Sequence, residues 1–181
     1  WFFLAFRAGS IMREYYNIHC QNALSLENLA ITVSDDAEFK APALNVNDLA
    51  INAKDNGEVK ISQGIMAGNV VATVTDHAEF KSASISANEV ALTATGDSEI
   101  KLKDCGLERL TGVSGDNAEI KLSGKCSIVS YTAKGNSQIV ADELVANGGV
   151  ATANDMSTIR TNVASLQTNV DSEMATIKNF R

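Results

Sequence analysis

The chain contains little of the residues that define several protein classes. Its 181 residues include one proline and three cysteines, too few cysteines for a disulfide-stapled scaffold. No apolar run approaches the roughly 18 residues that a membrane-spanning helix requires, so we expect no transmembrane span. No long Gly/Ser-rich stretch interrupts the sequence, and we therefore predict no flexible linker.

Positive charge is also scarce. The chain has 15 Lys and Arg residues against 22 Asp and Glu residues, a net charge of −7. Nucleic acids and anionic lipids bind clustered basic residues, so we expect neither as the main partner. The two histidines, His19 and His77, lie far apart in the sequence. This argues against a His-based metal site or a catalytic triad, and no motif indicates a cofactor.

A six-residue phrase recurs along the chain at intervals of 19–21 residues. It reads Asp-Asp-Ala-Glu-Phe-Lys in its first copy, at residues 35–40. Further copies occupy residues 55–60, 76–81, 96–101 and 116–121, with degenerate copies at 135–140 and 155–160. A fixed period of this size is typical of a solenoid, in which each unit is one coil that is buried by stacking on its neighbours.

Each repeat divides into three short strands and three corners. Before each phrase, apolar residues alternate with small or hydroxylated ones, as at residues 29–33 and 90–94, and this period of two is typical of strands. The Asp, Asn and Gly residues that open the phrase favour a turn, and Glu-apolar-Lys begins the second strand. A third strand, for example residues 44–46, completes the coil. The sequence predicts an all-β protein, a single-stranded parallel β-helix of about eight coils with about 20 residues per coil.

The repeat domain is predicted to span residues 24–181, and residues 1–23 differ from it. Six of the ten aromatic residues fall within residues 1–16. We expect this apolar and aromatic N-terminal segment to cap an open end of the solenoid. The alternative is the tail of a signal-peptide hydrophobic region, with the chain a mature form or a fragment.

Turns such as Gly96-Asp97-Ser98-Glu99-Ile100-Lys101, between strands that read Val-x-Leu-Thr-Ala, resemble the head GIN domain of auto-transporter adhesins. The resemblance covers about residues 24–180, with Asp-Asp-Ala or Asp-Asn-Gly in place of that family's Gly-Ser-Gly turns. It implies a right-handed parallel β-helix of the kind exported by Bacteroidetes. It also implies a cell-surface or periplasmic location and an adhesive or binding role without a catalytic site.

Stacking of the coils should place the charged residues of the phrase in two outward columns. The column of acids is Glu38, Glu58, Glu79, Glu99 and Glu119, and the column of bases is Lys40, Lys60, Lys81, Lys101 and Lys121. These columns are a candidate binding surface for a glycan, a protein partner or a second copy of the chain. The interpretation we favour is a solvated face whose charges prevent edge-to-edge aggregation.

Three other features have simpler structural explanations. The turn acids could bind calcium, but calcium needs about six converging oxygens, so a turn-forming role is preferred. A column of outward threonines resembles an ice-binding face, although ordinary β-propensity explains it; its members are Thr32, Thr73, Thr93, Thr132 and Thr152. Cys105 and Cys126 are one coil apart and should be stacked neighbours, either bonded or, as we prefer, buried as free thiols.

The near-uniform repeat length bears on function. It leaves no long loop to build the groove of polysaccharide-cleaving β-helices, so we predict a non-enzymatic protein. The predicted function is an exported adhesin-like binding module at the cell surface, the outer membrane or in the periplasm, with a glycan or a surface protein as partner. The alternative is a structural envelope protein that self-assembles through a strand face or the N-terminal segment.

Overall fold

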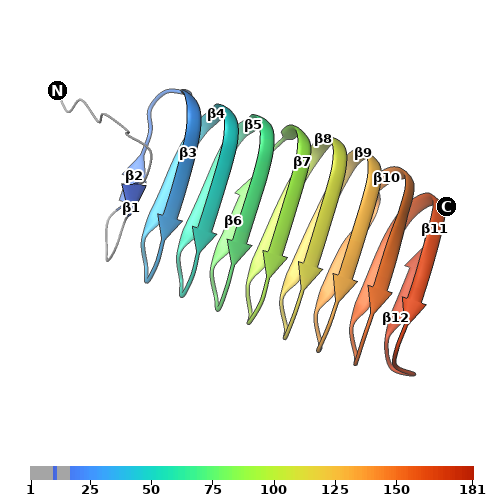
Figure 1. The fold of residues 1–181 in the computed structure, drawn as a ribbon. Coiled ribbons are helices and arrows are strands. Elements are labelled where there is room, and N and C mark those ends of the chain that lie inside the picture. The colour runs from blue at the N-terminus through green and yellow to red at the C-terminus, as the bar shows by residue number, and fades with distance from the viewer. Residues whose placement is uncertain (1–9, 12–16) are drawn as a thin grey trace.

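The computed structural model describes residues 10–11 and 17–181, and all regular elements in these residues are strands of one parallel sheet wound into a solenoid (Figure 1). The strands are β1 (Ser10–Ile11), β2 (Asn17–His19), β3 (Leu24–Val33), β4 (Glu38–Ala53), β5 (Glu58–Val74), β6 (Glu79–Ser82), β7 (Ile85–Ala94), β8 (Glu99–Ser114), β9 (Glu119–Ala133), β10 (Gln138–Ala153), β11 (Thr158–Val170) and β12 (Thr176–Asn179). The predicted parallel β-helix of about eight coils is confirmed.

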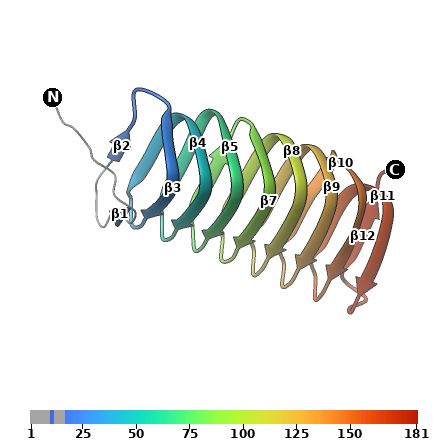
Figure 2. The ribbon, with the colours of Figure 1, turned by 45° about the horizontal axis from the view of Figure 1, so that its top comes forward.

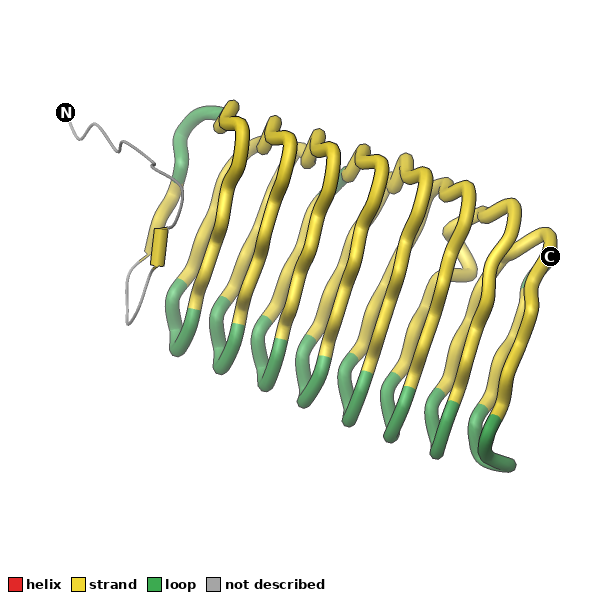
Figure 3. Tube along the Cα trace, in the orientation of Figure 1, coloured by secondary structure: helices red, strands yellow, loops and turns green. Residues whose placement is uncertain are grey.

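One coil consists of a turn followed by a long strand that bends twice. In β4, inward residues alternate with outward ones, and the alternation breaks where two consecutive residues point outward, at residues 42–43 and 47–48. We call residues 38–41 and their equivalents face 1, residues 44–46 face 2 and residues 48–53 face 3. Corner 1 lies between faces 1 and 2, and corner 2 between faces 2 and 3. The turns follow face 3 and line one edge of the rod (Figures 2 and 3).

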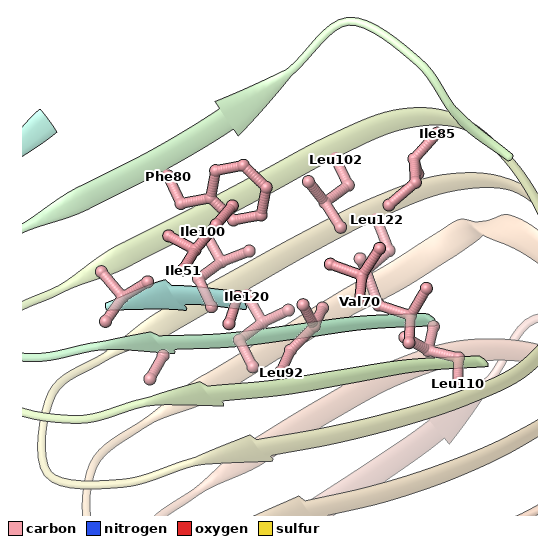
Figure 4. Packing of buried hydrophobic residues seen from close by; sticks show 14 of the residues in the cluster. Ile51, Val70, Phe80, Ile85, Leu92, Ile100, Leu102, Leu110, Ile120 and Leu122 are labelled. Atoms are coloured by element: carbon pink, nitrogen blue, oxygen red, sulfur yellow. The ribbon is translucent and has the colours of Figure 1, made fainter. Parts of the chain in front are cut away.

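The coils stack in register, so equivalent residues form columns. Phe39 of β4 pairs with Val59 of β5, and Phe80 of β6 pairs with Ile100 of β8. These side chains are almost completely buried. Figure 4 shows Phe80 and Ile100 projecting into the same interior as Leu92 from the opposite face. Each coil therefore buries its apolar residues against the coils on either side, as expected for a solenoid.

The irregular positions lie at corner 1. The turn at residues 115–118 has the same four-residue form as the others. The pairing of β8 with β9 instead shifts between Leu102 and Cys105. There Gly124 has a φ of 118°, and a Cβ on it would lie 2.3 Å from the Cys105 nitrogen. The two backbones approach closely at this corner, so position 124 requires glycine. This close approach accommodates the coil that begins at Glu119, which is short, with 19 residues to Gln138.

The stack begins before residue 24. Ile18 of β2 pairs with Phe39 of β4 and is partly buried against the core. β1 pairs with β3. Residues 17–19 thus occupy the position of a Glu-apolar-Lys segment in a preceding coil. The predicted capping role of residues 1–23 falls mostly on residues outside those described, and it stays a prediction.

Candidate functional site

Face 1 carries the two charged columns expected from the sequence. β4, β5, β6, β8 and β9 pair in register there, so each Glu of the phrase lies beside the next Glu and each Lys beside the next Lys. Strand spacing of about 4.8 Å would make each column repulsive alone. The two columns lie two residues apart on the same strand, which allows them to neutralise each other.

Most of these charges are paired within the face. The Glu58 Oε1–Lys60 Nζ distance is 2.8 Å, and the Glu119 Oε2–Lys121 Nζ distance is 2.7 Å. Glu38 pairs with Lys40, and Glu79 with Lys81. Exposed pairs of this kind contribute little to stability individually. Their arrangement leaves few unpaired charges for a ligand, which supports the interpretation as a solvated face.

Ion pairs also form between residues of adjacent coils. Glu99 does not pair with Lys101 of its own coil. Its Oε2 lies 3.3 Å from Lys81 Nζ of the preceding coil, and its Oε1 lies 3.0 Å from Lys121 Nζ of the following coil. Lys101 has no carboxylate within 4.0 Å among the residues that the structure describes.

The paired columns shift the pKa values of their members. The pKa of Glu38 is lowered to about 2, chiefly by the hydrogen bond from Lys40 and also by His19 at 2.8 Å, against the opposing effect of burial. The hydrogen bond to Glu119 raises the pKa of Lys121; burial opposes this, and the second bond to Glu99 reinforces it. These shifts hold Glu38 and Lys121 in their charged forms near neutral pH.

The series of Glu–Lys ion pairs on face 1, which we call the ladder, ends at β10. Gln138 and Val140 take the positions of Glu and Lys there, and Arg160 of β11 takes the Lys position in the next coil. Arg160 pairs with Asp142 of corner 1 instead of a residue on face 1. Its guanidinium also lies 5.2 Å from the centre of the Phe180 ring, within the range of a cation–π contact.

A groove of about 480 Å³ runs along corner 1 where the ladder ends. Lysines line its β8 and β9 side, the two carboxylates lie on β10, and Arg160 lines its β11 end. It is lined by Lys101, Lys103, Lys121, Ser123, Val140, Asp142, Glu143 and Arg160, with Leu102 and Leu122 beneath. Sequence reasoning missed this groove, although the loss of the Glu and Lys letters at residues 138 and 140 marks its position.

A second groove, of about 510 Å³, lies over face 2 and corner 2. Consecutive coils contribute Asn88, Glu108, Ser127 and Asn147 to it, together with Lys125. Gly106 leaves this surface open because no atom lies within 4 Å of the position of a Cβ. Asn88 and Asn147, which lie at corner 2, thus line a polar depression.

Face 3 has two outward columns that carry no charge. One contains Ala50, Val71, Ala91, Thr111, Ser130 and Val150, and the other contains Thr32, Asn52, Thr73, Thr93, Val113, Thr132 and Thr152. Val71 is 55% exposed and Val150 is 43% exposed. The predicted threonine column therefore exists, interrupted by Asn52 and Val113.

The turn acids act on backbone and on one another. Asp76 and Asp155 have φ values of 63° and 59°, a left-handed conformation that Asp tolerates better than most residues. Asn117 Nδ2 donates a hydrogen bond to Asp97 Oδ1 of the preceding coil at 2.8 Å. Within residues 10–11 and 17–181, no group of three His, Cys, Asp or Glu side chains is placed to hold a metal ion.

The two central cysteines are not stacked on each other. Cys105 pairs in register with Gly124, and Cys126 pairs with Leu107, so the expectation of stacked neighbours is wrong. Their separation of 21 residues exceeds by one the spacing of 20 between Leu102 and Leu122, and the shift at corner 1 adds a second residue of offset. Both are buried free thiols, as preferred from the sequence.

The comparisons with known proteins agree with the fold. The family described as "Putative auto-transporter adhesin, head GIN domain" matches residues 69–173, more than half of the chain. The chain matches no curated protein and no solved structure. The described residues contain no helix with the length and hydrophobicity of a membrane span.

Proposed function

The chain belongs to the head GIN domain family, and from this premise we propose that it is a non-enzymatic, exported binding module of adhesin type. Its ligand would be a glycan or a surface protein held along the side of the solenoid. The location would be the cell surface, the outer membrane or the periplasm.

One observation carries this proposal. The coils are uniform, and the depressions over corners 1 and 2 are lined by polar side chains from consecutive coils. Such surfaces repeat at the strand spacing of about 4.8 Å along the rod. They suit an elongated ligand that makes several weak polar contacts, as a saccharide chain does, and multiple contacts raise the overall affinity.

A glycan array probed with the purified protein tests the binding role. The expected result is binding of a defined subset of saccharides by a monomer, with light scattering used to establish the oligomeric state. Binding of no saccharide and no surface protein would contradict the proposal. Protease treatment of intact cells tests the location, because a surface protein is degraded while a periplasmic one is protected.

The alternative function is self-assembly through a strand face. The observation that favours it is the pair of uncharged outward columns on face 3, where Val71 and Val150 are exposed. A chain of net charge −7 would repel its copies least across such a surface. A stable dimer or trimer without ligand, abolished by Val71→Lys, would support this alternative over the first.

A further inference from the structure

Lys101 is distinguished from the other lysines of its column by its environment. The neighbouring Lys81 and Lys121 both contact Glu99. Lys101 does not contact Glu99; it lines the groove at corner 1 with Lys103 from the same strand and with the paired Lys121. Lys103 likewise forms no ion pair within the described part of the chain. Two cations are therefore available side by side on the surface of an acidic protein.

Two carboxylates line the groove farther along, on β10. Asp142 is paired with Arg160 at the β11 end, and Glu143 is an exposed carboxylate that lies beside Ser123 of the preceding coil. Val140 also lines the groove and is half-buried. The groove spans β8 to β11, and at about 4.8 Å per coil this corresponds to roughly 14 Å.

We infer that this corner 1 groove binds a carboxylate-bearing sugar unit of an acidic polysaccharide. The sugar carboxylate would accept hydrogen bonds from Lys101 and Lys103, which is a charge-assisted arrangement. Ring hydroxyls would donate to Asp142 and Glu143, and the apolar face of the ring would pack on Val140. This inference rests on the proposed binding function and specifies its ligand.

The two carboxylates on β10 make other polyanions poor ligands. A nucleic acid carries a charge on every nucleotide, so its backbone would meet the carboxylates of Asp142 and Glu143. A neutral sugar would leave Lys101 and Lys103 without a partner. A unit with one carboxylate and several hydroxyls satisfies both the lysines and the carboxylates of the groove.

The probe is a polygalacturonate oligosaccharide, and the matched control ligand is the same oligosaccharide with its carboxylates methyl-esterified. Titration calorimetry with the whole chain should show binding of the acid and at least roughly tenfold weaker binding of the ester. The double variant Lys101→Gln/Lys103→Gln should lose about tenfold or more in affinity. Glu143→Gln should weaken binding a few-fold.

The control variant is Lys40→Gln/Lys60→Gln, which removes the same charge from the same face outside the groove. It should bind like the wild type, and circular dichroism should show that both double variants keep their β structure. Equal losses in the two double variants, or equal binding of acid, ester and single-stranded DNA, would overturn the inference.

Failure of the inference can be separated from failure of the proposed function. If the array detects saccharides whose binding is unaffected by Lys101→Gln/Lys103→Gln, the protein is a glycan-binding module that uses another surface. If no saccharide binds but a surface protein does, only the inference fails; if neither binds, both proposals fail.

Discussion

Tyr131 of β9 stacks directly on Gly112 of β8, and the missing side chain of Gly112 makes room for the tyrosine ring. A Cβ at Gly112 would lie 3.3 Å from Tyr131 Cδ1. On the other side, the equivalent residue of β10 is the small Ala151. The ring is fully buried, and its hydroxyl has no hydrogen-bond partner among the described residues. Burial accordingly raises the pKa of Tyr131 above its ordinary value.

Replacing this tyrosine by phenylalanine should stabilise the protein. A buried polar group without a partner costs about 1–3 kcal/mol, and Tyr131→Phe removes it while keeping the ring. We expect the free energy of unfolding in urea to rise by about 1 kcal/mol. As a control, Gly112→Leu should lower it by about 1–3 kcal/mol because it overpacks the same space. A loss of stability in Tyr131→Phe would show that the hydroxyl has a favourable contact.

Glu38 should make stability dependent on pH in the acidic range. Its pKa is about 2 in the folded chain, against an ordinary value of 4.5. Ionised Glu38 therefore stabilises the fold fully above about pH 4.5, and this contribution is lost as the pH falls toward 2. Carbon-detected NMR should show the Glu38 carboxyl titrating near pH 2. Lys40→Met should move the midpoint upward because it removes the main hydrogen bond; an unchanged midpoint would contradict this origin.

The Glu38→Gln variant provides an independent measurement of the same linkage. Between about pH 5 and about pH 2, its free energy of unfolding should fall less steeply than that of the wild type. A parallel decline in the two proteins would show that other carboxyl groups account for the pH dependence.

The sequence predicts the structure of one coil well because the repeated residues have local conformational and burial preferences. Asp35 and its equivalents mark turns through their tolerance of positive φ, and Phe39 and its equivalents mark the core through a period of two. The groove at corner 1 depends on contacts that the letters do not encode. Lys81, Lys101 and Lys121 have the same local sequence context, yet only Lys101 lies outside the ladder. Glu99 pairs with lysines of the adjacent coils, and these partners are visible only in the stacked structure.

The cysteine error has a similar cause. Cys105 and Cys126 are separated by 21 residues, within the 19–21 range of the repeat, whereas β8 and β9 pair at a spacing of 20 residues before corner 1 and 19 after it. The register between β8 and β9 shifts at corner 1. The number of residues between two cysteines does not show where in the coil such a shift occurs.

The turn position occupied by Gly96 should tolerate few substitutions. Its φ is 75°, and a Cβ would lie 2.8 Å from the backbone nitrogen and Cα of Asp76. Gly96→Val combines a strained left-handed backbone with this contact, so we expect a loss of roughly 2–3 kcal/mol in the free energy of unfolding. Asp55→Gly, at the equivalent position of another coil, should change stability by less than about 1 kcal/mol. Thermal unfolding of the two variants makes the comparison, and equal losses would contradict the role of backbone conformation.

The three cysteines should differ in reactivity toward a thiol reagent such as iodoacetamide. The thiolate is the reactive form, and burial raises the pKa of Cys105 to about 12 and also raises that of Cys126. Cys20 is only partly buried, so it should be labelled first in the native protein. Mass spectrometry should find Cys105 and Cys126 unmodified until urea unfolds the chain, when all three should react. Native labelling of Cys126 at the rate of Cys20 would show that face 2 opens locally, because access to this thiol requires the stacked strands to separate.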